Sequence, residues 1–184
     1  TDEWVEPVPG VYVHVSAEVH PTATFMGSAL VGPRTYIGPY AYIREHVIIG
    51  ADCVVSNSSE VKQAVLFDGV QVPHFNYVGD SILGYKAHLG AGAIISNYRS
   101  DHQEVRVRLP QDGGGGSKQL VGTGRRKFGC LMGDEVEVGC NSVINPGSLL
   151  ERGVRVDPLT DVRGHVPAEH IRKRDGRLIK LEAR

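Results

Sequence analysis

The architecture of this chain can be read from Val31-Gly-Pro-Arg-Thr-Tyr-Ile37-Gly-Pro-Tyr-Ala-Tyr-Ile43, where one pattern recurs every six residues. An aliphatic residue opens each unit, and Gly-Pro follows it at once. The same step places an aliphatic or aromatic anchor in every unit from Val13 to Val61 and, with two five-residue steps, onward to Ile95. The pattern returns between Met132 and Val162. An internal repeat of this kind predicts a solenoid before any local propensity is considered.

A period of six residues fits neither an amphipathic helix nor an alternating strand. It suits a coil with three flat sides, in which each unit supplies one short strand and one corner of Gly, Asp, Asn or Pro. The anchors then point inward, and a small residue four positions later fills the space beside them. We predict an all-β fold, a single-stranded parallel β-helix of about seven coils.

The repeat divides the chain into three parts. Residues 1–12 read as an extended lead-in, residues 13–166 as the β-helix domain, and residues 167–184 as a C-terminal helix or tail. Apolar residues among the charges of this last part predict a helix, broken at Gly176, that caps the open end of the solenoid.

An excursion at residues 101–127 interrupts the repeat. Within it, residues 104–109 alternate like a strand and residues 118–121 resemble its return, so we expect a hairpin that leaves the solenoid wall. The glycine run at residues 113–116 reads either as a flexible tip or as an engineered linker. The basic run at residues 125–127 either meets a phosphate of a ligand or is a solvated surface run.

Composition narrows the class of protein. The formal net charge of −1 gives no general attraction to nucleic acid or to a membrane surface. No apolar stretch approaches membrane-spanning length. The three cysteines show no spacing typical of a zinc site or a disulfide framework. We therefore expect a cytoplasmic protein without a bound metal.

The repeat also predicts which side chains stack on successive coils. Arg44 and Lys62 each follow an anchor on the same side of the coil, and Gly79 continues their column. Stacked about one strand spacing apart, the two cations form either an anion pocket or two solvated surface charges.

A second column holds Asn57, His74 and Ala91. His74 is a candidate general base, or a corner histidine without a role. Ala91 and Gly92, one coil farther on, leave room for a slender ligand, and a backbone N–H of this corner is a candidate oxyanion donor.

Several short motifs then point to a known family. They are Ile37-Gly-Pro-Tyr-Ala-Tyr-Ile-Arg44, Ser59-Glu-Val-Lys62, His74-Phe-Asn-Tyr77, Val78-Gly-Asp80, Leu89-Gly-Ala-Gly92 and Asn97-Tyr98. In this order they closely resemble the acetyltransferase half of bifunctional N-acetylglucosamine-1-phosphate uridyltransferase, a hexapeptide-repeat acyltransferase. The resemblance implies a left-handed β-helix, acetyl-CoA as co-substrate and a homotrimer with its active sites between subunits.

The same resemblance implies roles for individual residues. It implies that His74 is the base that deprotonates an amino-sugar phosphate similar to glucosamine-1-phosphate, or a sugar nucleotide. The other implied residues bind the acceptor (Arg44, Lys62, Tyr77, His88, Asn97 and Tyr98) or line the CoA groove (Ala91 and Cys140). Two of these depart from the family pattern, which has asparagine at His88 and serine at Cys140.

Other functions remain open at this level. The family's nucleotidyltransferase domain is absent from the sequence, so that activity is not expected. A non-catalytic sugar-nucleotide-binding or scaffold protein is the main alternative. A metal hydrolase similar to γ-type carbonic anhydrases is less favoured, because no closely spaced histidine pair lies on one face.

Overall fold

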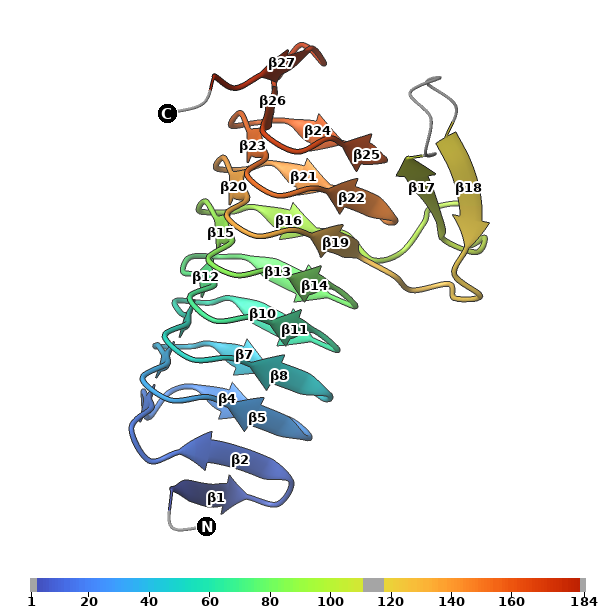
Figure 1. The fold of residues 1–184 in the computed structure, drawn as a ribbon. Coiled ribbons are helices and arrows are strands. Elements are labelled where there is room, and N and C mark those ends of the chain that lie inside the picture. Colours follow the sequence, from blue (N-terminus) through green and yellow to red (C-terminus); the bar gives the residue numbers. More distant parts are fainter. Residues whose placement is uncertain (1–2, 111–117, 183–184) are drawn as a thin grey trace.

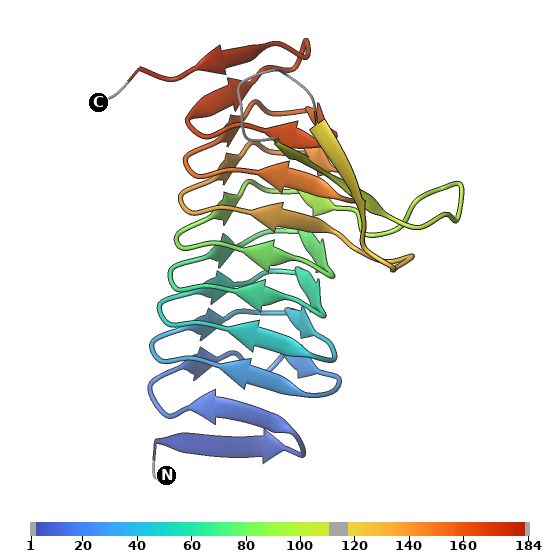
Figure 2. The same cartoon turned by 45° about the vertical axis from the view of Figure 1, so that its right-hand side comes forward.

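The structure is a computed structural model that describes residues 3–110 and 118–182. These residues wind into a parallel β-helix of about eight coils whose walls are three flat sheets (Figure 1). Each coil passes through three sheets, here called A, B and C, in turn, so the strands of the coils pair parallel with the strands one coil away (Figure 2). The predicted all-β β-helix is confirmed. None of the described residues forms a helix long and apolar enough to cross a membrane.

The three walls consist of short strands. Sheet A contains β1 (Trp4–Val8), β2 (Val11–His14), β5 (Ala29–Val31), β8 (Val47–Ile49), β11 (Val65–Leu66), β14 (Ile82–Leu83), β19 (Cys130–Met132), β22 (Ser148–Leu150) and β25 (His165–Val166). Sheet B contains β3 (Glu18–Val19), β6 (Tyr36–Ile37), β9 (Val54–Val55), β12 (Gln71–Val72), β15 (His88–Leu89), β20 (Glu137–Val138), β23 (Arg155–Val156), β26 (His170–Arg172) and β27 (Leu178–Lys180). Sheet C contains β4 (Thr24–Phe25), β7 (Tyr42–Ile43), β10 (Glu60–Lys62), β13 (Tyr77–Gly79), β16 (Ile94–Ile95), β21 (Val143–Ile144) and β24 (Asp161–Val162).

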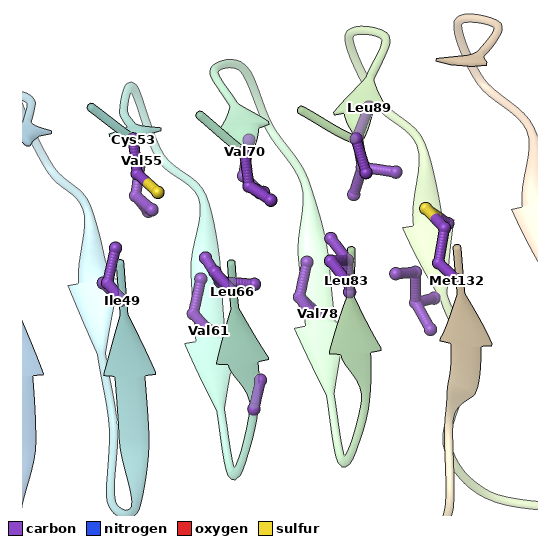
Figure 3. Close-up of a cluster of buried hydrophobic side chains, with 14 of the residues drawn as sticks. Ile49, Cys53, Val55, Val61, Leu66, Val70, Val78, Leu83, Leu89 and Met132 are labelled. Carbon is purple, nitrogen blue, oxygen red and sulfur yellow. The ribbon is translucent and has the colours of Figure 1, made fainter. Parts of the chain in front are cut away.

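The repeat anchors form the core. Figure 3 shows Ile49, Val55, Val61, Leu83 and Leu89 pointing inward from their strands, and each of these side chains is buried. Burial of aliphatic side chains contributes about 1.5–3 kcal/mol each, so a column of anchors stabilises the stack of coils. Two predicted anchors of the first coil, Val19 and Phe25, stay partly exposed because only β1 lies beyond them.

The five-residue step after Val61 changes which residue fills the core. Ala64 is buried at the small-residue position, while Val65 pairs with Ile48 and Ile82 on the outer face of sheet A. The six-residue pattern predicts Val65, four positions after the anchor Val61, at this inward position. The prediction is wrong by one residue, because the step that follows Val61 is one residue shorter.

The excursion forms the predicted hairpin, which we call the arm. Its strands β17 (Arg106–Pro110) and β18 (Lys118–Gly122) pair antiparallel (Figure 1), and β17 lies beside β22 and β25. Val105 and Val107 are buried against the solenoid. Gly147 permits this approach, because a Cβ there would lie 2.4 Å from the Arg106 carbonyl oxygen. The predicted glycine tip falls outside the described residues.

The predicted capping helix is wrong. β26 pairs with β23 as a further rung of sheet B, and β27 returns antiparallel to β26. Asp175-Gly176 lies in the turn between these strands, with Gly176 at φ +91°. An Asp-Gly pair between two extended segments is a hairpin signal, and a strand can hydrogen-bond to the open backbone edge of the last coil where a helix cannot.

Candidate active site

One corner column brings together three of the expected site residues. At the corner between sheets B and C, Phe75 N–H donates to the Asn57 carbonyl (2.9 Å), and Gly92 N–H donates to the His74 carbonyl (3.0 Å). These bonds confirm the predicted stacking of Asn57, His74 and Ala91.

Cys140 continues the column one coil beyond Ala91. The Asn141 N–H donates to the Ala91 carbonyl (2.9 Å), although the arm separates these two coils in the sequence. The Cys140 side chain is exposed, whereas Cys53 and Cys130 are buried, and burial raises their thiol pKa values to about 11 and about 12. Cys140 is thus the accessible thiol among the three.

Asn76 fixes the backbone that carries His74. Its buried amide donates to the carbonyls of Gly90 (2.8 Å) and Ala93 (3.1 Å) in the next coil and accepts from the His74 N–H (3.0 Å). Phe75 has φ +52°, the left-handed conformation that recurs at the corners of this solenoid, with φ +57° at Tyr40 and at Ser58 in the equivalent positions. The corner is therefore held tightly, while the His74 side chain stays exposed to solvent.

The second predicted column lies at the opposite end of the sheet C strands. The registers of β7, β10 and β13 place Arg44 beside Lys62, and Lys62 beside Gly79. The outer face of sheet C therefore runs from the His74 corner at one end of its strands to this pair of cations at the other. A strand of this length spans only about 7–10 Å, which suits a single sugar ring with its substituents.

Two carboxylates accompany the cations. Arg44 Nη1 lies 3.0 Å from Glu60 Oε1, and Arg44 Nε lies 3.4 Å from Glu45 Oε2. The ammonium of Lys62, whose side chain is only 8% exposed, lies 3.7 Å from Glu45 Oε1 and donates to Gln63 Oε1 at 3.0 Å. The charges of Arg44 and Lys62 are thus matched by those of Glu45 and Glu60.

These contacts and the burial of the site shift the pKa values of three of its side chains. The hydrogen bond to Glu60 raises the pKa of Arg44. A backbone hydrogen bond at Glu45, together with the cations Arg44 and Lys62, lowers the pKa of Glu45. Burial raises the pKa of the Tyr77 phenol, and the nearby Glu60 adds to the shift. Near neutral pH, Arg44 and Glu45 are therefore ionised and Tyr77 keeps its proton.

Tyr77 and Asn97 meet above Gly79. Asn97 Nδ2 donates to Tyr77 Oη (3.1 Å) and to Asp80 Oδ2 (2.5 Å). A Cβ at Gly79 would lie 2.6 Å from both Asn97 Nδ2 and Tyr77 Oη. The glycine of the Val78-Gly-Asp80 motif thus leaves the space in which these two expected sugar ligands come together.

His88 lies on a different wall. It points from the outer face of sheet B, where its Nδ1 is 2.7 Å from Glu137 Oε2 on the strand directly opposite. A carboxylate at this distance favours the tautomer with the proton on Nδ1 and leaves Nε2 free to accept a hydrogen bond.

Tyr98 leaves the solenoid altogether. It pairs with Lys127 across the base of the arm, and its Oη is 3.0 Å from His102 Nδ1. Within one protomer, Arg44, Lys62, Tyr77 and Asn97 therefore lie together, while His88 and Tyr98 lie on neighbouring surfaces.

Some of these partners were accessible to sequence reasoning and were missed. Glu45 and Glu60 occupy positions next to the cations that the repeat places at the same edge. Asn76 lies within the His74-Phe-Asn-Tyr77 motif, but its hydrogen bonds to the next coil depend on the three-dimensional arrangement of the coils. Glu137 is separated from His88 by the whole arm, so sequence spacing could not pair them. Among residues 3–110 and 118–182, no group of three or more His, Cys, Asp or Glu side chains is arranged to hold a metal ion.

Comparison with known proteins now identifies the family. Residues 25–151 match the family model described as the GMPPB C-terminal domain. The chain belongs to this family. The expected relationship to the hexapeptide-repeat superfamily, with its left-handed β-helix, is thereby confirmed.

Two curated relatives and one solved structure resemble this chain. A bifunctional sugar-1-phosphate nucleotidylyltransferase/acetyltransferase from Sulfurisphaera tokodaii is 36% identical over 69% of this chain and 28% of its own length. The bifunctional protein GlmU of Leifsonia xyli subsp. xyli is 44% identical over 75% of this chain and 27% of its own length. The chain thus spans about a quarter of these relatives. A hexapeptide transferase family protein from Anaplasma phagocytophilum shares the fold, with a TM-score of 0.56, 13% identity and coverage of 95% and 82% of the two chains.

Proposed function

We propose that this protein is an acetyl-CoA-dependent N-acetyltransferase that acts on an amino-sugar phosphate or an amino-sugar nucleotide. One observation carries the proposal: the corner column of His74, Ala91 and Cys140 borders the face that bears Arg44 and Lys62. An exposed imidazole thus lies between a groove with small side chains and a polar sugar-sized face. The named acetyltransferase activity of a relative supports the same reaction.

The acyl donor follows the corner column. The pantetheine arm of acetyl-CoA lies along Ala91 and Cys140, where small side chains leave the wall open. The acceptor lies across the outer face of sheet C, with its phosphate at Arg44 and Lys62 and its ring at Tyr77 and Asn97. Binding both substrates in this way brings the amine to the thioester at the His74 corner, which lowers the entropic barrier to reaction.

The reaction needs one general base, and that base must later give its proton to the leaving group. His74 takes a proton from the sugar amine as the nitrogen attacks the thioester carbonyl. The tetrahedral intermediate then collapses to the amide, its C–S bond breaks, and the departing CoA thiolate takes the proton from the His74 imidazolium. No other reactant is required.

The oxyanion donor is Ala91 rather than Gly92. The Gly92 N–H is already bonded to the His74 carbonyl at 3.0 Å, whereas the Ala91 N–H has no hydrogen-bond acceptor among the described residues. A free backbone N–H beside the attacked carbonyl stabilises the charge that develops there.

A homotrimer would complete the site. His88 lies on sheet B and Tyr98 at the base of the arm, so neither side chain is directed at the His74 of its own chain. A neighbouring subunit would supply them. The outer face of sheet A offers a surface for such packing at its first coils, where Tyr12, Leu30 and Ile48 are 47%, 38% and 49% exposed in one column. Exposed apolar patches of this kind are typical of protein interfaces.

The test is release of free CoA thiol from acetyl-CoA. Glucosamine-1-phosphate, galactosamine-1-phosphate and UDP-amino sugars would be offered as acceptors, with His74→Ala as the control. Turnover with one acceptor that His74→Ala abolishes is the expected result. Tight acetyl-CoA binding without turnover on any acceptor would refute an amino-sugar acceptor.

A non-catalytic sugar-nucleotide-binding or scaffold function is the second candidate. It is favoured by the His74 ring, which has no hydrogen-bond partner among residues 3–110 and 118–182 to orient it as a base. Specific binding of a sugar nucleotide, with neither acetyl-CoA binding nor thiol release, would establish this function.

A further inference from the structure

A hollow of about 350 Å³ lies around the corner from the sheet C face, between the solenoid and the base of the arm. Residues 125–128, which we call the strap, form its outer wall. Arg125, Lys127 and Phe128 line the hollow from the strap, and Gln63 and Asp80 line it from the solenoid. The motifs that indicated an acetyltransferase assign nothing to this hollow.

The strap is fixed in place by its backbone. Phe128 N–H donates to the Asn97 carbonyl (2.9 Å), Gly129 N–H donates to the Asp80 carbonyl (2.8 Å), and Lys127 pairs with Tyr98. The side chains of Arg125 and Lys127 are nevertheless exposed and form no ion pair with any described residue. Arg125 and Lys127 thus lie on a rigid segment without a carboxylate partner among the described residues, whereas Arg44 and Lys62 lie close to Glu45 and Glu60.

The hollow shares a wall with the proposed acceptor site. Gln63 Oε1 accepts the hydrogen bond of Lys62, and Asp80 Oδ2 accepts that of Asn97. Each of these hydrogen bonds joins a residue that lines the hollow to a residue that is proposed to bind the acceptor sugar. The two sites are therefore adjacent, on either side of the corner between sheets C and A.

The lining indicates the chemistry of this molecule. The floor is apolar and consists of Ala64, Val65, Ile82 and Leu131, with Phe128 beside it. The charged and titratable groups at the rim are Arg125, Lys127, His46 and Asp80, of which His46 is bonded to Ser28 and Asp80 to Asn97. A flat ring suits the floor, and a phosphate suits the two free cations.

We propose that the hollow binds the nucleoside diphosphate portion of a sugar nucleotide. The phosphate next to the sugar lies at Arg44 and Lys62, the second phosphate at Arg125 and Lys127, and the base on the apolar floor. This inference rests on the proposed function and narrows it: the acceptor is an amino sugar linked to a nucleoside diphosphate, rather than a simple sugar phosphate.

The experiment compares three proteins: the wild type, the double variant Arg125→Ala/Lys127→Ala, and Arg126→Ala. Arg126 is the matched control, because it lies between the two cations but does not line the hollow. Binding of UDP alone is measured by calorimetry, and kcat/KM is measured with UDP-glucosamine, glucosamine-1-phosphate and acetyl-CoA. We expect the double variant to lose at least about tenfold in UDP affinity and in kcat/KM for UDP-glucosamine. In the double variant, kcat/KM for glucosamine-1-phosphate should stay within about twofold of the wild-type value. In Arg126→Ala, the UDP affinity and both kcat/KM values should also stay within about twofold.

Several results would overturn the inference. These are no UDP binding by the wild type, equal UDP binding by the double variant, an equal loss with glucosamine-1-phosphate, or a selective rise in the KM for acetyl-CoA. UDP binding that requires the strap, in a protein that acetylates none of the acceptors, would support the nucleotide site and contradict the acetyltransferase function. Turnover of glucosamine-1-phosphate by a protein that does not bind UDP would support the acetyltransferase function and contradict the nucleotide site.

Discussion

Sheets A and C have nearly the same backbone but opposite outer surfaces. On sheet A the outward column is apolar and includes Leu30 and Ile48, whereas on sheet C it includes Glu60 and Tyr77, with Arg44 and Lys62 at the edge. Both walls bury the same kind of anchor on their inner side. The inward positions thus specify the coil, and the outward positions are free to carry packing on one wall and chemistry on another.

The largest effect should come from the corner that borders sheet C. His74→Ala should lower kcat by about 10²–10⁴-fold, because it removes the general base. Acetyl-CoA affinity, measured by calorimetry, should stay within about twofold, since Ala91 and Cys140 are untouched. A variant that lost acetyl-CoA binding in parallel with turnover would show that His74 supports the groove rather than the reaction.

The next effect separates the inner and outer sides of one strand. Ile49→Ala removes a buried anchor of β8 and should lower the free energy of unfolding by about 2–5 kcal/mol. Ile48→Ala, its outward neighbour, should change monomer stability by no more than about 0.5 kcal/mol. Chemical denaturation measures both values.

Ile48 also tests the role of the sheet A face. If this face packs against another subunit, Ile48→Ala should shift sedimentation toward smaller species at low protein concentration. An unchanged oligomeric state together with unchanged stability would remove sheet A from the interface.

Arg44→Ala should have a more selective effect. It removes one of the two cations proposed to hold the acceptor phosphate and should raise the acceptor KM by about tenfold or more. The KM for acetyl-CoA should be unaffected, because the corner column lies at the other end of the sheet C strands. Steady-state kinetics with each substrate varied in turn would check this, and an unchanged acceptor KM would refute the phosphate site.

These contrasts also show how far the sequence can predict the molecule. The inward anchors and the two columns follow from the six-residue period, because each coil repeats the register of the one before. The arm hairpin follows from the break in that period and from the alternation of residues 104–109. The end of the chain did not follow: residues 168–182 have no coil beyond them to set a pattern, and they pair as β26 and β27. Partners across the arm, such as His88 and Glu137, required the three-dimensional register.

The smallest effect concerns pH. The pKa of Glu45 is lowered from its usual 4.5, so its ionised form stabilises the folded state above that pH. This contribution should be lost as the pH falls through the lower folded-state value. Thermal unfolding of the wild type should therefore lose slightly more Tm than that of Glu45→Gln between neutral pH and pH values below 4.5. Identical pH dependence of the two proteins would show that the Glu45 contacts with Arg44 and Lys62 do not stabilise the fold.

The most direct measurement is a crystal structure of the protein with CoA and an amino-sugar acceptor bound together. It should show the CoA sulfur beside Ala91, the phosphate at Arg44 and Lys62, and the acceptor nitrogen within about 3.2 Å of a His74 ring nitrogen. An acceptor bound away from the outer face of sheet C, or a CoA sulfur distant from His74, would contradict the proposed site.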